Sequence, residues 1–176
     1  MTQPRIPHGS AVLFGLAGWS GSGKTTLAEQ LIAELTAQGL NMATIKHAHH
    51  EFDADTPGKD SWRHRQAGAH QVLVSSAIRS AHFVEHQTAE PTLAQLLDRL
   101  QPCDLVLIEG YKREAVPKLE IYRAAVGKPQ LWPDDPRIIA VASDDPLPDC
   151  PLPVLDLNDI PAIAAFVRTA TGLTGG

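Results

Sequence analysis

The chain has 176 residues, of which 43% are hydrophobic and 20% charged, and its formal net charge is −5. This composition is that of a folded globular protein and excludes an intrinsically disordered chain. The acidic balance gives no reason to expect nucleic-acid binding, and no apolar run is long enough to cross a bilayer. Two cysteines do not make a disulfide framework, and residues 1–10 lack an apolar leader. We therefore expect a single cytoplasmic domain over residues 1–176.

The first predicted elements are a buried strand over 11–17, a glycine-rich loop over 18–25 and a helix that ends near Gln38. The loop reads Gly18-Trp19-Ser20-Gly21-Ser22-Gly23-Lys24-Thr25 and matches the phosphate-loop pattern G-x-x-x-x-G-K-[ST]. Its glycines let consecutive N–H groups turn toward phosphate oxygens, while Lys24 reaches the outer phosphates and the Thr25 hydroxyl ligates magnesium.

A second strand is predicted over 41–46, and the loop over 47–59 that follows it is rich in histidine and aspartate. In one interpretation Asp53, Asp55 or Asp60 joins a magnesium shell beside the phosphate loop. In another, the loop's histidines build a transition-metal site. A solvated polar loop is the third, and the sequence leaves all three open.

Residues 60–90 are expected to hold a short helix and a hairpin. Asp60 and Ser61 would cap a helix that runs to Gly68, and strands are predicted at 72–74 and 78–86. A basic group precedes the hairpin, and its members are Lys59, Arg63, His64 and Arg65. This group suits either a phosphate or a solvated helix face.

A helix is predicted after Pro91, with Leu93, Leu96, Leu97 and Leu100 as its apolar face. The apolar run 105–108 is typical of a strand buried in a parallel sheet, and Glu109 follows it directly. In an open α/β sheet, ligands bind at the carboxyl ends of strands. Glu109 is therefore predicted to face the phosphate loop, as a magnesium ligand or as the group that orients an attacking water.

The remaining elements alternate strands with loops and end in a helix. Residues 118–123 read as a half-exposed strand, 127–136 as a loop, and 137–142 and 154–157 as strands. Asn158 or Asp159 would cap the last helix. The alternation predicts a three-layer α/β fold around a mostly parallel sheet.

Asp144 lies just beyond the strand 137–142. A carboxylate there could accept hydrogen bonds from the N1–H and exocyclic amine of guanine, which would favour GTP over ATP. A turn opened by aspartate before Pro146 is the simpler alternative.

Together these motifs resemble the family of molybdopterin-guanine dinucleotide biosynthesis protein B (MobB). The resemblance rests on the phosphate loop together with five further motifs, which are 45–50 (Ile-Lys-His-Ala-His-His), 53–61, 65–69, 107–112 (Leu-Ile-Glu-Gly-Tyr-Lys) and 140–144. It implies a P-loop NTPase fold, GTP and Mg²⁺ as ligands, and weak GTPase activity. By position, it implies that Thr25 holds the magnesium, that Glu109 has the second acidic role, and that the phosphates are held by Trp19, Ser20, Gly21, Ser22, Gly23, Lys24, Thr25 and Thr26. We predict Lys24 and Glu109 as the catalytic residues, and Thr25, Glu109 and Asp60 as the metal ligands.

The same resemblance implies an adapter in molybdenum cofactor biosynthesis that acts beside the guanylyltransferase (MobA), with molybdopterin as a further candidate ligand. It also implies a homodimer, whose contact strands we expect near 76–88 and 115–135, outside the parallel core. Two other classes stay open. An ATP-dependent small-molecule kinase would seat its substrate near Arg63, Arg65 and Lys112, and a pure binding module would hydrolyse nucleotide only incidentally.

Overall fold

The computed structural model describes residues 11–48, 52–111 and 114–173, and these fall into two compact units. One unit comprises Met1–His47 and Gln95–Gly176, and the other comprises Ala48–Ala94. The hairpin predicted near 76–88 lies within the second unit.

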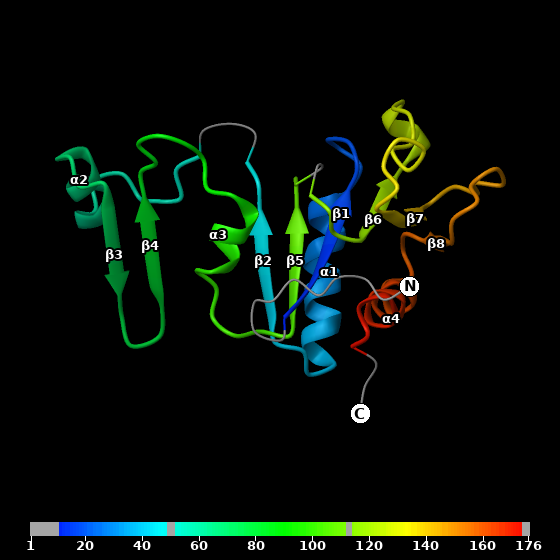
Figure 1. Cartoon of the computed structure of the whole chain (residues 1–176), viewed down its shortest axis with the longest axis horizontal. Coiled ribbons are helices and arrows are strands. Elements are labelled where there is room, and N and C mark those ends of the chain that lie inside the picture. The colour runs from blue at the N-terminus through cyan, green and yellow to red at the C-terminus, as the bar shows by residue number, and fades with distance from the viewer. Residues whose placement is uncertain (1–10, 49–51, 112–113, 174–176) are drawn as a thin grey trace. The chain divides into compact units, whose positions relative to one another are not determined.

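The first unit is built on a parallel sheet with helices, as the alternation of elements predicted (Figure 1). In the described residues this sheet has six strands in the order β2-β5-β1-β6-β7-β8. The strand bounds are β1 Val12–Ala17, β2 Met42–Lys46, β5 Leu105–Glu109, β6 Lys118–Tyr122, β7 Ile138–Ser143 and β8 Val154–Asp156. All of the pairings in this sheet are parallel, so the carboxyl ends of the strands meet at one edge.

Helices α1 (Lys24–Ala37) and α4 (Ile160–Thr171) pack against each other and against β1 (Figure 1). The predicted stripe on α1, formed by Leu27, Leu31 and Leu35, is buried. It meets side chains of the sheet that recur at every second residue, such as Phe14 and Leu16 on β1. Asp159 caps α4 by accepting a hydrogen bond from the N–H of Ala162 at 3.0 Å, as predicted.

The prediction for residues 118–123 was wrong about their environment. Lys118–Tyr122 form β6, which lies between β1 and β7 inside the parallel sheet and is not an added strand outside the core. Its polar residues Lys118 and Glu120 are 3% and 0% exposed. Both are buried with partners from the 127–135 loop, so the polar alternation did not mark an exposed strand.

The second unit contains α2 (Asp60–Gln66) and the antiparallel hairpin of β3 (Gln71–Ser75) and β4 (Ser80–Val84). The hairpin prediction is confirmed. The predicted cap is not, because Asp60 is the first helical residue and the Ser61 hydroxyl instead donates to Asp55.

Helix α3 is shorter than predicted and covers Leu93–Leu97. The N–H groups of Arg99 and Leu100 then bond to carbonyls three residues earlier, so the chain tightens into turns before the apolar face is complete.

Candidate functional site

The carboxyl edge of the parallel sheet brings together residues that lie far apart in the sequence. The phosphate loop follows β1, Glu109 ends β5, Arg123 follows β6, and Asp144 follows β7. In the strand register, Leu16 pairs with Glu109 and Tyr122 pairs with Ser143, which sets these four features side by side along one edge. The predicted positions of Glu109 and Asp144 on this edge are confirmed.

The phosphate loop has the close packing that its glycines predict. A Cβ atom on Gly18 (φ +147°) would lie 2.6 Å from the Ile121 carbonyl oxygen and 2.7 Å from Ser22 Oγ. Gly23 immediately precedes α1, and its backbone has φ +97°, a value that residues with a side chain rarely adopt. Ser22 is 2% exposed, and its buried Oγ has no hydrogen-bond partner. The loop is therefore a tight turn that presents backbone N–H groups and a buried hydroxyl at the start of a helix.

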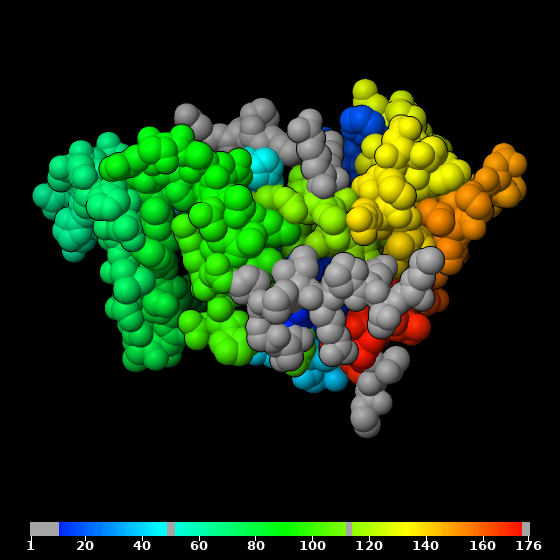
Figure 2. Space-filling view, in the orientation of Figure 1, coloured from blue at the N-terminus to red at the C-terminus, as the bar shows by residue number. Residues whose placement is uncertain are grey.

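Hydrogen bonds made by Lys24 and Trp19 hold the phosphate loop in place. Lys24 Nζ donates to the Trp19 carbonyl oxygen at 2.8 Å, and Trp19 Nε1 donates to the Pro129 carbonyl oxygen at 2.7 Å. The ammonium group of Lys128 lies 5.9 Å from the centre of the Trp19 ring. The space-filling view shows the loop (dark blue) next to the yellow surface of the 127–135 loop (Figure 2). The phosphate loop is thus held against a second loop that the sequence did not connect to it.

Glu109 is a mostly buried acid with a cationic neighbour. Its side chain is 16% exposed, and Lys46 Nζ lies 3.6 Å from its carboxylate. Gly110 follows with φ +94°, and a Cβ there would lie 2.9 Å from the His47 carbonyl oxygen, so the strand end is narrow. Asp104, just before the other end of β5, accepts a hydrogen bond from the Asn41 N–H at 2.7 Å and so has a structural role.

Asp144 is paired with an arginine that the sequence analysis did not single out. Arg123 Nε lies 3.4 Å from Asp144 Oδ2, and their side chains are 41% and 35% exposed. The hydroxyl of the preceding Ser143 accepts the Asp145 N–H at 3.0 Å, so Asp144 stands in a tight turn. The sequence analysis placed Arg123 inside a strand outside the parallel core, so the signal that identified Glu109, a position at the end of a buried strand, did not point to it.

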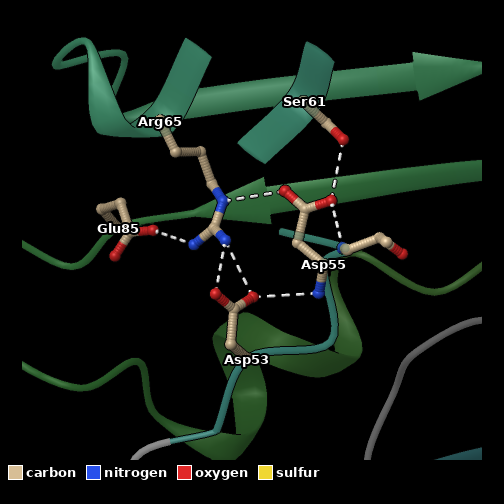
Figure 3. Close-up of polar contacts among 6 residues, drawn as sticks. Asp53, Asp55, Ser61, Arg65 and Glu85 are labelled. Carbon is tan, nitrogen blue, oxygen red and sulfur yellow. Dashed lines mark hydrogen bonds and ion pairs between the residues drawn. The ribbon is translucent and has the colours of Figure 1, made fainter. Parts of the chain in front are cut away.

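In the second unit, two of the acids considered as metal ligands, Asp53 and Asp55, bind Arg65 together with Glu85 (Figure 3). Arg65 Nη2 donates to both carboxylate oxygens of Asp53 at 2.8 Å, Nε donates to Asp55 at 3.1 Å, and Nη1 donates to Glu85 at 2.7 Å. The Arg65 side chain is 11% exposed, and its guanidinium lies 5.4 Å from the centre of the Phe83 ring. This cluster ties the loop before α2 to the end of β4.

The cluster shifts the titration of its members. Hydrogen bonds from Arg65 hold the pKa of Asp53 below its ordinary value of 3.8. Burial works to raise the pKa of Asp55, but hydrogen bonds from Ser61 and Arg65 outweigh it and lower the pKa. The same contacts, with Asp53 first, raise the pKa of Arg65. Arg65 is thus committed to carboxylates of its own unit, which disfavours its predicted use as a phosphate ligand.

Three other predicted ligands are exposed side chains in the first turns of helices. Thr25 and Thr26 are exposed in the first turn of α1. Asp60 is exposed at the start of α2 in the other unit, so its predicted share in a metal site with Thr25 stays a prediction. In 11–48, 52–111 and 114–173 no group of three histidine, cysteine, aspartate or glutamate side chains is arranged to hold a metal ion. His49, His50, Lys112 and Arg113 lie outside the described residues.

None of the helices within the described residues has the length and hydrophobicity that a membrane span needs.

Comparison with known proteins gives one consistent result. The family model of molybdopterin guanine dinucleotide synthesis protein B (MobB) matches residues 13–144. A molybdopterin-guanine dinucleotide biosynthesis adapter protein of Haemophilus influenzae is 45% identical over 160 residues, which cover 89% of this chain and 87% of that protein. The Escherichia coli protein of the same name is 43% identical over 159 residues, which cover 88% of this chain and 90% of that protein.

Solved structures agree with this fold. The crystal structure of Bacillus subtilis MobB has a TM-score of 0.70 at 25% identity, and the match covers 94% of this chain and 99% of the other. A crystal structure of molybdopterin-guanine biosynthesis protein B has a TM-score of 0.69 at 23% identity, with 90% and 99% covered.

Proposed function

Because the chain belongs to the MobB family, we propose that it is an adapter protein of molybdopterin guanine dinucleotide biosynthesis that binds GTP with Mg²⁺. The observation that carries this proposal is the edge of the sheet, where the phosphate loop follows β1, Glu109 ends β5 and Asp144 follows β7. These are the positions at which an open α/β fold binds its ligand.

The phosphate loop has the features that a nucleoside triphosphate requires. Gly18 leaves no space for a side chain between Ile121 and Ser22, so backbone alone lines that part of the turn. The buried Ser22 hydroxyl lacks a partner, which favours a ligand with acceptor oxygens. In our proposal Lys24 exchanges its bond to the Trp19 carbonyl for the outer phosphates, and the α1 N-terminus adds favourable N–H groups.

Mg²⁺ would neutralise phosphate charge when it is bound with the nucleotide. Thr25 and Glu109 offer the hard oxygen ligands that this ion prefers, one from α1 and one from the end of β5. We also propose a weak GTPase activity in which the Glu109 carboxylate orients water toward the terminal phosphorus, while Lys24 and the loop amides stabilise the developing negative charge.

The Asp144 carboxylate supports GTP as the nucleotide. It lies two strands away from the phosphate loop, at the end of β7, and keeps an exposed edge. In this proposal its two oxygens accept the N1–H and the exocyclic amine of guanine, which adenine does not present.

The proposed partners are the guanylyltransferase of the pathway and a second copy of the chain, in the cytoplasm; molybdopterin remains a candidate ligand. For the second copy we retain the β3–β4 hairpin as the contact, and no longer β6. Leu73 and Ile78 on this hairpin are 69% and 93% exposed, and exposed apolar side chains favour an interface. We expect Leu73→Ser with Ile78→Ser to halve the mass measured by light scattering if wild type is a dimer. If the double variant still has the mass of a dimer, the hairpin is not the dimer contact.

Calorimetric titration with GTP and with ATP, each with Mg²⁺, tests the function. We expect GTP to bind at least about tenfold more tightly than ATP. Lys24→Ala should abolish binding with the fold retained, and Glu109→Gln should keep binding while it lowers turnover. Tighter ATP binding, with turnover stimulated by an added acceptor, would replace the adapter by a small-molecule kinase. Wild-type affinity in Lys24→Ala would remove the phosphate loop from the proposal.

A further inference from the structure

Arg123 joins the two halves of the proposed nucleotide site. It follows β6, the strand that separates β1 with its phosphate loop from β7 with Asp144. On one side its guanidinium lies against Gly23, where a Cβ atom would be 3.7 Å from both Nε and Nη2. On the other side its Nε lies 3.4 Å from Asp144 Oδ2.

Both members of this ion pair keep hydrogen-bonding groups that the pair does not use. Its 3.4 Å separation is longer than the roughly 2.7–2.9 Å of a strong charge-assisted hydrogen bond. Arg123 Nε is buried and has no hydrogen-bond partner, although the side chain as a whole is 41% exposed. Asp144 is oriented by a neighbouring charge, yet its carboxylate still has free lone pairs and an exposed edge.

We propose that Arg123 is a positioning residue for nucleotide specificity, which holds the Asp144 carboxylate at a fixed place relative to the phosphate loop. This inference rests on the proposed function, because it assumes that Asp144 meets the base. A carboxylate rejects a wrong base only if it is held in place, since a mobile acid can turn away from a ligand that lacks donors. The guanidinium also lies at van der Waals distance from the loop at Gly23, so Arg123 contacts both the phosphate loop and Asp144.

The inference distinguishes two roles that an arginine beside a phosphate loop could have. A phosphate ligand would strengthen the binding of every nucleotide and of tripolyphosphate alike. A positioning residue for Asp144 would affect GTP most, because GTP makes two hydrogen bonds to the carboxylate, inosine triphosphate less, and tripolyphosphate not at all. Inosine triphosphate lacks the guanine amine and keeps the N1–H and the phosphates, so it isolates one of the two hydrogen bonds.

The test measures the affinities of GTP, inosine triphosphate and tripolyphosphate, each with Mg²⁺, by calorimetry. For wild type we expect GTP to bind at least about tenfold more tightly than inosine triphosphate. Arg123→Met keeps a long apolar stem over Gly23, and we expect the ratio to fall to about twofold while tripolyphosphate affinity stays within about threefold. Arg123→Lys restores the charge without the planar group and should recover part of the ratio. Asp144→Asn, which removes the proposed acceptor of the guanine hydrogen bonds, shows what ratio to expect when guanine is no longer recognised.

Arg137→Met is the matched control, because Arg137 is exposed at the opposite end of β7. It should leave all three affinities unchanged, and thermal unfolding verifies that each variant is folded. A ratio that Arg123→Met and Arg123→Lys both preserve would overturn the inference alone. Equal losses for all three ligands would overturn it in favour of a phosphate ligand. Wild type that binds GTP no better than ATP would overturn the proposed function, and this inference with it.

Discussion

Strands β4 and β6 both alternate polar with apolar residues, but they occupy opposite environments. On β4, Ser80 and His82 are exposed, and the strand pairs only with β3 among the described residues. On β6, Lys118 and Glu120 are buried between two parallel neighbours. Alternation therefore reports where polar groups recur, whereas their environment depends on the partners that the rest of the chain supplies.

Those partners are specific for β6. Glu120 accepts the N–H of Leu131 at 2.7 Å with one oxygen and the N–H of Trp132 at 2.9 Å with the other. Burial raises the pKa of the Glu120 carboxyl above its ordinary value, and these two N–H groups oppose the rise. Lys118 Nζ donates to Asp135 at 2.8 Å. The 127–135 loop is therefore fixed by β6, and through Pro129 it also meets Trp19 of the phosphate loop.

The largest expected effect is that of Glu120→Ala. It removes the acceptor of two N–H groups and leaves them unpaired in a buried place, which should lower the free energy of unfolding by about 3 kcal/mol. The matched change on β4 is His82→Ala, which should cost no more than about 0.5 kcal/mol because the side chain is exposed. Urea unfolding measures both. Equal effects would contradict the contrast drawn between the two strands.

Lys118→Met should have the second largest effect. Methionine keeps the stem that packs on Gly15, where a Cβ atom would lie 2.8 Å from Lys118 Cγ. The change leaves the Asp135 carboxylate without its cation, and since that side chain is 25% exposed we expect a loss of about 2 kcal/mol. Asp135→Asn in the same chain should recover part of the loss in urea unfolding. A double variant whose loss equals the sum of the two single losses would show that the pair is not coupled.

Most of the parallel fold could be predicted because its signals are local. A short stretch of sequence is enough to recognise each of its main features, which are the apolar runs of β1, β5 and β7, the stripe of α1 and the phosphate loop. Glu109 and Asp144 could be placed on one edge because each directly follows such a strand. The edge itself needs no knowledge of distant contacts, since parallel strands all end on the same side.

What the sequence did not indicate depends on contacts between residues ten or more positions apart. The buried Glu120 carboxylate accepts hydrogen bonds from the N–H groups of Leu131 and Trp132, and the sequence gives no sign of these partners. Its polar side chain therefore made β6 look half exposed. Asp53 and Asp55 looked like metal ligands because their cation, Arg65, lies ten or more residues further along. Arg123 was passed over because its strand was placed outside the core, and the end of such a strand does not lie on the edge that carries the phosphate loop.

The smallest expected effect concerns the Arg65 cluster and its dependence on pH. The folded pKa of Asp53 lies below its ordinary value of 3.8, mainly through the hydrogen bonds from Arg65. A depressed pKa means that the carboxylate stabilises the fold above the unfolded pKa, and that this contribution is lost as the pH falls through the folded value. Because the Asp53 side chain is 46% exposed, the effect should be modest and local to the second unit.

Amide hydrogen exchange of β3 and β4, compared between wild type and Asp53→Asn from pH 6 to pH 2, measures this contribution. We expect wild type to be better protected at pH 6, and the two proteins to converge below the ordinary pKa as Asp53 becomes protonated. Asp60→Asn, an exposed acid of the same unit, should show a smaller difference. A difference that grows as the pH falls would mean that Arg65 does not stabilise the charged form of Asp53. The strands β1 and β5 should exchange alike in all three proteins, because the cluster lies within Ala48–Ala94.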